Sequence, residues 1–186
     1  MLPLSVDEAV AAERSGRRLR YLYFWGHRPT RDGRVGPGCL SQWWPASFTE
    51  AGHTFASAEH YMMAHKAWLF DDDETAARIL DAPTPAEAKK LGRTVRHFDE
   101  TVWDAHRFGI VTRASTAKFG QHEELRGFLL GTGEQVLVEA SPVDRIWGIG
   151  LAADDERAAS PSTWRGLNLL GFALMAARDT LSSAPL

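Results

Sequence analysis

The sequence contains a single cysteine, Cys39, among its 186 residues, so no disulfide can form within the chain. The N-terminus lacks the basic-then-apolar pattern of a secretory signal peptide. No apolar run approaches the roughly 20 residues that a helix needs to span a bilayer. These absences predict a cytoplasmic protein without a membrane partner, because an unpaired thiol is typical of a reducing compartment.

Several signatures of chemistry are absent as well. The sequence has no G-x-S-x-G elbow, no Walker phosphate loop and no Cys-His nucleophile motif. His60 and His65 are five residues apart, which turns them about 140° away from each other on a helix. We therefore expect no metal site. Residues 148–153 match G-x-G-x-x-A in form, but no strand ends directly before them, which argues against a dinucleotide-binding fold.

The composition indicates one globular domain. Hydrophobic residues make up 44% of the chain and charged residues 24%, and the formal net charge of −3 gives no reason to expect a protein that coats nucleic acid. Arginines nevertheless crowd the N-terminal part: Arg14, Arg17, Arg18, Arg20, Arg28, Arg31 and Arg34. This cluster either binds phosphate groups or forms a solvated face. Seven tryptophans suggest that several of them wall a pocket for a flat ligand.

Residue patterns predict seven helices and a few strands. We expect helices at 6–14, 57–70, 71–80, 85–92, 99–119, 123–130 and 166–181, and strands at 19–25 and 135–140. Residues 30–39 are predicted as an exposed loop, and 40–55 as short strands or irregular structure. The predicted fold class is α+β: a single compact, helix-rich domain with a few short strands, spanning 1–186 with a core at about 19–182.

The segment that follows the strand at 135–140 is the first candidate for chemistry. Pro142 ends the strand, and Asp144 then lies in a loop with Trp147 and two glycines. An acid at the end of a buried strand, beside an indole, is suited to acid/base work. The alternative is an exposed turn aspartate that only caps local backbone.

The helix at 57–70 is the second candidate. Helical spacing places Glu59, Met62, Met63, Lys66 and Phe70 on one face. Glu59 and Lys66 are roughly 10 Å apart along the axis, which suits the two ends of one pocket. Beside apolar neighbours Lys66 would be desolvated, which lowers the pKa of its amine and makes it a usable nucleophile. The alternative is that Lys66 lies at the rim of the fold and Glu59 merely caps the helix start.

A third candidate is Trp103, in the helix that Asp99 caps. Its spacing groups it with Ile110 on a face typical of a core. A pocket role for Trp103 requires that Glu59 and Asp144 act with it.

A series of short motifs extends from Tyr21 to Leu181. They are Ala58 to Met63 with Lys66 and Ala67; Leu91 to Arg93 with Phe98, Asp99, Trp103 and Asp104; Lys118 and Phe119; Leu130 to Gly133; Leu137 to Pro142; Asp144 to Gly148; and Trp164 to Asn168. In this order they resemble the NADAR family, also called YbiA-like N-glycosidases.

The resemblance implies a helix-rich α+β domain that hydrolyses the bond between ribose and a nitrogenous ring without a cofactor. In the family, some members cleave early intermediates of riboflavin biosynthesis, and others remove ADP-ribose from modified guanine in nucleic acid. Glu59, Trp103 and Asp144 match positions implicated in catalysis. Lys66 matches a lysine next to the sugar that could attack the anomeric carbon.

The resemblance also guides the choice of substrate-binding residues. We expect these to be Phe24, Arg93, Trp147, Trp164 and Asn168. One departure is visible, because His60 stands where the family often has glutamine, and it is a candidate for tuning substrate choice or pH response. The expected partner is a small ribosyl-phosphate or ADP-ribosyl substrate, with ADP-ribosylated nucleic acid as a further candidate.

Two alternatives from other classes stay open. A binding module could use the same tryptophans and arginines to hold ADP-ribose or NAD without cleaving it. An oligomeric scaffold could use the aromatic residues as an interaction surface, and the sequence leaves the oligomeric state open.

Overall fold

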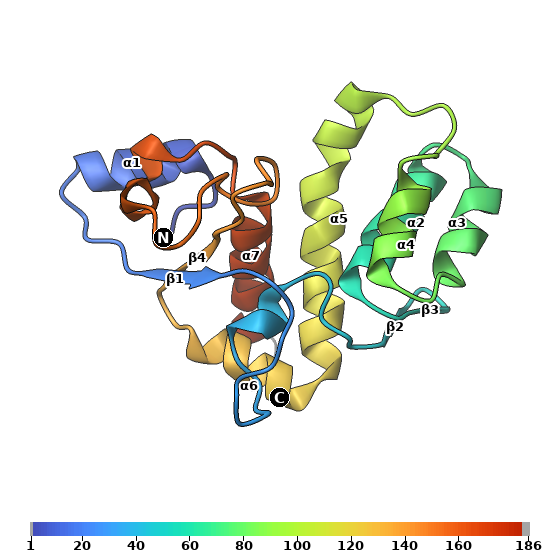
Figure 1. Ribbon diagram of the computed structural model, residues 1–186, viewed down its shortest axis with the longest axis horizontal. Helices are drawn as coiled ribbons and strands as arrows, with labels where there is room; N and C mark the ends of the chain where they lie inside the picture. Colours follow the sequence, from blue (N-terminus) through green and yellow to red (C-terminus); the bar gives the residue numbers. More distant parts are fainter. Residues whose placement is uncertain (1, 184–186) are drawn as a thin grey trace. The chain divides into compact units, whose positions relative to one another are not determined.

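The computed structural model describes residues 2–183, which form helices with a few short strands (Figure 1). The α-helices are α1 (Val6–Arg14), α2 (Ala58–Leu69), α3 (Asp73–Leu80), α4 (Pro85–Gly92), α5 (Glu100–Gln121), α6 (Glu123–Gly131) and α7 (Leu169–Ser183). The strands are β1 (Tyr21–Phe24), β2 (Phe48–Glu50), β3 (His53–Phe55) and β4 (Val136–Glu139). Three short 3-10 helices are η1 (Pro37–Leu40), η2 (Glu156–Ala159) and η3 (Pro161–Thr163). The predicted α+β, helix-rich class is confirmed.

The chain forms two compact units. Unit 1 comprises residues 1–41 and 124–186, and unit 2 comprises residues 42–123. Each has its own set of packed elements, and the prediction that the whole chain is one domain stays a prediction. Among the residues that the structure describes, no helix is both long enough and apolar enough to cross a membrane.

Unit 1 is built on two parallel strands. β1 pairs with β4 from Tyr21 opposite Val136 to Phe24 opposite Glu139. Helix α7 packs closely on β4, and a Cβ atom at Gly171 would lie 2.0 Å from the carbonyl oxygen of Leu137. Only glycine permits this approach, and it accounts for the complete burial of the middle of β4.

Unit 2 is built around α2, which packs against α3, α4 and α5. Ser57 caps α2 by accepting a hydrogen bond from the backbone N–H of His60. A hairpin of β2 and β3 precedes the helix, and its rings Phe48 and Phe55 lie 5.8 Å and 4.8 Å from the ring of Tyr61. α4 approaches α2 at Gly92, where a Cβ atom would lie 2.1 Å from the sulfur of Met63.

Most predicted helices match the structure to within a few residues. The largest difference is the last helix, predicted from 166 but observed from Leu169, because the preceding residues bond to the loop after β4. The predicted strand 19–25 is reduced to Tyr21–Phe24, and Trp25 is exposed. The predicted loop 30–39 ends earlier than expected, in η1.

Candidate functional site

In unit 2, the amine of Lys66 lies among aromatic rings. Its Nζ donates a hydrogen bond of 2.8 Å to the carbonyl of Gly92 and lies 4.2 Å from the centroid of Phe98. The ring of Trp103 is 5.7 Å from the same atom. Burial lowers the pKa of Lys66 below the ordinary value for lysine. This is the desolvated environment that makes an amine a better nucleophile at neutral pH.

Lys66 also has a structural role. Its ammonium group bonds to one of the last carbonyls of α4, where a helix leaves acceptors without partners and favours positive charge. Lys66 therefore has both a desolvated amine and a capping interaction with α4, and substitutions at Lys66 must distinguish these two functions.

Glu59 lies in the first turn of α2 and is only 2% exposed. Ser57 caps the helix through the N–H of His60, and Glu59 lies in the first turn, so the alternative in which Glu59 only stabilises the helix start stays open. The backbone N–H of Glu59 donates to the carbonyl of Gln42 at 3.0 Å, which fixes this turn. A carboxyl group so deeply buried is costly unless its surroundings compensate it, which is typical of functional positions.

Trp103 is buried near the start of α5, whose first turn is capped by Asp99 through the N–H of Val102 at 2.9 Å. Ile110, two turns further along α5, is buried as well, as the core face predicts. Unit 2 thus brings the rings of Phe98 and Trp103 to the amine of Lys66.

Phe98 was not predicted as a site residue. A local signal could have identified it, because Phe98 directly precedes the cap Asp99 and Trp103 is the fourth residue of the helix. Hydrophobic residues at these two positions commonly pack together as a staple. The structure places both rings around Lys66 instead of leaving Phe98 as a simple surface residue.

In unit 1, Asp144 shapes the loop after β4. Its Oδ1 atom accepts hydrogen bonds of 2.8 Å from the N–H groups of both Ile146 and Trp147. This is the backbone-capping role that the sequence left as an alternative. Asp144 is partly exposed, and no hydrogen bond to Oδ2 is present within residues 2–183, which leaves that oxygen for a ligand.

The strand that precedes this loop is held by Asn168, which is fully buried. Its Oδ1 accepts from the N–H of Glu139 and its Nδ2 donates to the carbonyl of Leu137, each at 2.9 Å. Asn168 has a φ of +52°, a conformation that asparagine tolerates better than most residues. Its amide therefore holds β4 in place, and contact with a substrate stays a prediction.

The other predicted substrate-binding residues differ in exposure. Trp164 is partly buried, donates from Nε1 to the carbonyl of Ala158 at 2.9 Å, and packs edgewise on Tyr21. Phe24 is buried at the end of β1, whereas Trp147 is partly exposed and Arg93 is exposed.

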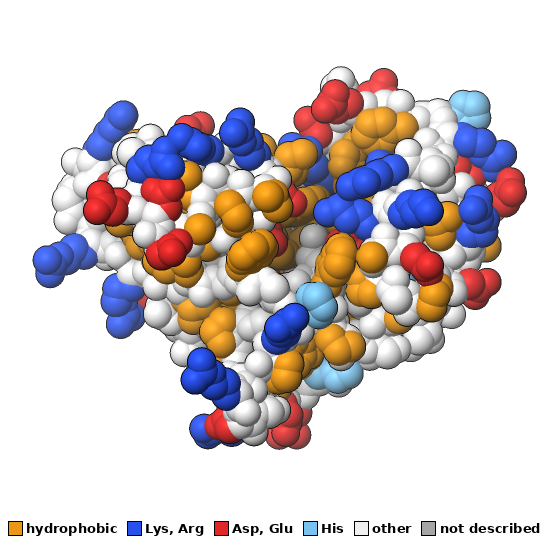
Figure 2. Space-filling model, in the orientation of Figure 1, with side chains coloured by type: hydrophobic (Ala, Val, Ile, Leu, Met, Phe, Trp, Pro, Cys, Tyr) orange, Lys and Arg blue, Asp and Glu red, His pale blue; other side chains and the backbone are white. Residues whose placement is uncertain are grey.

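The predicted site residues are divided between the two units. Unit 1 holds Phe24, Asp144, Trp147, Trp164 and Asn168; unit 2 holds Glu59, Lys66, Arg93 and Trp103. In unit 2, Lys and Arg side chains gather over the region of α3 and α4 (Figure 2). All seven arginines of the N-terminal cluster are exposed.

Two further features of unit 2 bear on ligands. A groove of about 470 Å³ is lined by Arg78, Asp81, Ala82, Pro83, Glu87, Lys90, Leu91 and Thr94. None of the predicted site residues lines it. Within residues 2–183, no group of three or more His, Cys, Asp or Glu side chains is arranged to hold a metal ion.

His60 is buried and hydrogen bonded through both ring nitrogens. Nε2 lies 2.9 Å from the carbonyl oxygen of Ala82, so Nε2 carries the proton, and Nδ1 accepts from the hydroxyl of Ser57 at 2.7 Å. Burial lowers the pKa of His60. His60 therefore links the start of α2 to the α3–α4 connection as a neutral imidazole.

This arrangement predicts a pH effect on stability. Because the folded state holds the pKa of His60 below its unfolded value of about 6.5, the unfolded state gains a proton first as the pH falls. Stability should therefore decline from pH 7 to pH 5, and His60→Gln should show a smaller decline. Burial also lowers the pKa of His65, so part of the decline should remain. Denaturant midpoints across this range test the effect, and equal slopes for both proteins would contradict it.

Comparison with known proteins identifies relatives of this chain. Residues 23–182 match the model of the NADAR domain. An N-glycosidase of Acanthamoeba polyphaga mimivirus is 44% identical over 165 residues, which cover 86% of this chain and 95% of the relative. The N-glycosidase YbiA of Escherichia coli is 32% identical over 139 residues, or 75% of this chain and 77% of the relative.

Structural comparison agrees. The NMR structure of Escherichia coli YbiA has a TM-score of 0.68 and 26% identity, and the match covers 97% of this chain and 94% of that one. These named relatives define a class of hydrolases that act on N-glycosyl bonds. The chain belongs to the NADAR family of N-glycosidases.

Proposed function

We propose that this protein hydrolyses the N-glycosidic bond between a nitrogenous base and a ribose that carries a phosphate or an ADP group. The observation that carries the proposal is the half-buried amine of Lys66 between Phe98 and Trp103, on the helix that also buries Glu59. Family membership supports the bond type. We also infer that both units act as one domain, because the family model spans residues of each. The single cysteine supports a cytoplasmic location.

The proposed chemistry uses two carboxyl groups and one amine. As the C1′–N bond breaks, positive charge develops on the ribose, and a carboxylate stabilises it. A general acid protonates the leaving nitrogen. Glu59 and Asp144 share these tasks. The neutral amine of Lys66 attacks C1′ and displaces the protonated base; water then attacks C1′, and the C1′–Nζ bond breaks as Lys66 leaves with its protons restored. Water thus supplies a hydroxyl group to C1′ and a proton to the base.

Binding is assigned to aromatic and basic side chains. Trp103 and Trp147 stack on the base, Arg93 contacts the phosphate, and Phe24, Trp164 and Asn168 complete or support the substrate-binding surface. The exposed position of Arg93 at the end of α4, whose last turn also carries Lys89 and Lys90, supports an anionic substrate.

Two substrate classes fit this chemistry. One is an early ribosylated intermediate of riboflavin biosynthesis, supported by a relative in Zea mays named as a riboflavin biosynthesis protein. That relative is 34% identical over 135 residues, although the match covers only 20% of its length. The other is ADP-ribosylated guanine in nucleic acid, from which a single modified base would leave the stack to reach the enzyme. A net charge of −3 disfavours non-specific duplex binding and makes the small metabolite the simpler substrate.

Calorimetry with ADP-ribose, followed by long incubation with an ADP-ribosylated base, separates an enzyme from a binding module. The proposal predicts that the protein binds ADP-ribose as a product and that, under the same conditions, it releases the base from the ADP-ribosylated substrate. Tight binding of ADP-ribose without release of any base from any ribosylated substrate would instead support the binding module.

A further inference from the structure

The segment that connects α4 to α5, residues 93–99, begins directly after one contact of Lys66 and carries another near its end. Its start is fixed where the carbonyl of Gly92 accepts the hydrogen bond from Lys66. Near its end, Phe98 covers the same amine and packs against Phe70 with ring centroids 5.3 Å apart. The shape of this segment therefore determines the surroundings of Lys66.

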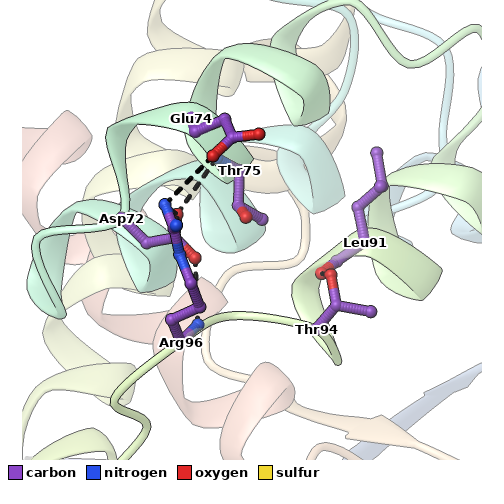
Figure 3. Close-up of polar contacts among 6 residues, drawn as sticks. All are labelled: Asp72, Glu74, Thr75, Leu91, Thr94 and Arg96. Carbon is purple, nitrogen blue, oxygen red and sulfur yellow. Dashed lines mark hydrogen bonds and ion pairs between the residues drawn. The ribbon is translucent and has the colours of Figure 1, made fainter.

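In the middle of the segment, Arg96 forms hydrogen bonds and an ion pair with Asp72 (Figure 3). Asp72 Oδ2 accepts from the backbone N–H of Arg96 at 2.9 Å, and Oδ1 accepts from Nε at 3.1 Å and Nη2 at 2.6 Å. The side chain of Asp72 is 0% exposed, whereas that of Arg96 is 57% exposed. These bonds hold the pKa of Asp72 well below its usual range, so the carboxylate is charged throughout the neutral range.

Two other groups share this contact. Asp72 Oδ1 caps α3 by accepting from the N–H of Thr75 at 3.3 Å, and Arg96 Nη2 lies 3.3 Å from Glu74 Oε2. Asp72 thus joins the start of α3 to the segment, and the exposed Glu74 contacts the same Nη2 atom at the longer distance, without bonding to Nε or to the backbone of Arg96. At the start of the segment, Thr94 donates to the carbonyl of Leu91 at 2.8 Å.

The turn between Arg96 and Phe98 needs this restraint. His97 has a φ of +56°, in the left-handed region that costs a non-glycine residue free energy. Such a conformation persists only where neighbouring contacts enforce it. Asp72 fixes the backbone on one side of His97, and the packing of Phe98 on Phe70 fixes it on the other.

Phe98 retains a free surface in this position. Its side chain is 44% exposed although it contacts both Phe70 and the amine of Lys66. A half-exposed ring beside a reactive amine is suited to stacking against a flat ligand, and such stacking is tolerant of the identity of the base.

We propose that Asp72 is a positioning residue that, through Arg96, holds residues 93–99 so that Phe98 stacks on the base of the bound substrate. This inference rests on the proposed function. Phe98 contacts substrate and covers the amine of Lys66, whereas Asp72 acts only through the segment.

The first test is Asp72→Asn, which keeps the size of the side chain and weakens the pairing with Arg96. We expect KM to rise about tenfold, the effect of losing one stacking contact, with kcat within about threefold of wild type. Glu74→Gln removes the same charge beside the same arginine and should leave both constants unchanged. A partly unfolded variant would lower kcat without raising KM. Comparing the effects on KM and on kcat therefore separates a loss of positioning from a loss of folded protein. An unchanged KM in Asp72→Asn would overturn the inference while the proposed function stands.

Two further variants keep the inference testable if Asp72→Asn folds poorly. Arg96→Lys leaves Asp72 intact and loses the two-point contact, so it should also raise KM. In a Phe98→Ala background, Asp72→Asn should add little, because both changes act on the same ring. Additive effects of the two substitutions on KM would contradict the inference.

A readout without substrate separates this inference from the proposed function. Acylation of Lys66 by a small reagent, followed by peptide mass spectrometry, reports how well Phe98 covers the amine. Labelling should be about threefold faster or more in Asp72→Asn and Phe98→Ala, and unchanged in Glu74→Gln. Faster labelling without any wild-type hydrolysis would reject the proposed function and the stacking role. Unchanged labelling would reject the positioning role itself.

Discussion

Replacing Asp144 by alanine is expected to lower turnover at least about a hundredfold, the usual contribution of a general acid or base. Its Oδ1 already bonds to the N–H groups of Ile146 and Trp147, which leaves Oδ2 for proton transfer or charge stabilisation. Steady-state release of the base measures the effect. Asp154→Ala, at an exposed position in the same part of unit 1, provides the control and should retain wild-type turnover.

A second substitution at Asp144 separates catalysis from loop structure. Asn keeps an oxygen that accepts from both backbone N–H groups but has no carboxyl group. Asp144→Asn should therefore fold like wild type and be nearly as inactive as Asp144→Ala. Wild-type turnover in folded Asp144→Asn would show that the residue only caps the loop.

Lys66→Ala is the second substitution with a large expected effect. It should lower turnover about a hundredfold or more, because loss of a nucleophile costs at least as much as loss of a general acid or base. Burial lowers the pKa of Lys66, so a larger fraction of the amine is neutral near pH 7 than in an exposed lysine. Lys90→Ala, which removes an exposed lysine from α4, should have little effect.

Lys66→Arg tests whether the amine reacts or only caps α4. Arginine keeps a positive charge and can still donate to the carbonyl of Gly92, but its guanidinium group is a poor nucleophile. We expect Lys66→Arg to fold and to remain as impaired as Lys66→Ala. The adduct of Lys66 at C1′ opens to an imine when the ring oxygen leaves, and borohydride added during turnover should reduce this imine and trap the sugar on Lys66 in wild type only. Wild-type turnover in Lys66→Arg would show that Lys66 caps α4 and would contradict its role as a nucleophile.

The elements of the fold follow from signals that lie close together in the sequence. Ser5 and Glu8 form the predicted capping pattern. Helix α1 begins where expected because the side chain of Ser5 accepts a hydrogen bond from the N–H of Glu8. Thr84 and Pro85 likewise start α4. These contacts span only three or four residues, so the sequence pattern contains all the information that they need.

The arrangement of the candidate site depends on contacts between distant segments. Asp72 and Arg96 are 24 residues apart, and nothing in the local pattern links an N-cap aspartate to the turn before α5. Asn168 reaches Glu139 across 29 residues, so its role in fixing β4 could be found only from the structure. Helical spacing led us to expect apolar neighbours of Lys66 on α2 itself, whereas the rings at its amine, Phe98 and Trp103, come from the residues before α5 and from α5.

The most direct test of the central claim is a chromatographic assay of base release. The purified protein is incubated with early ribosylated pyrimidine intermediates of riboflavin synthesis and, separately, with ADP-ribosylated guanine in DNA. An N-glycosidase should release the free base together with ribose 5-phosphate or ADP-ribose from at least one of them, at a rate that Asp144→Ala abolishes. If neither substrate releases its base during long incubation with folded protein, the proposed hydrolysis is contradicted.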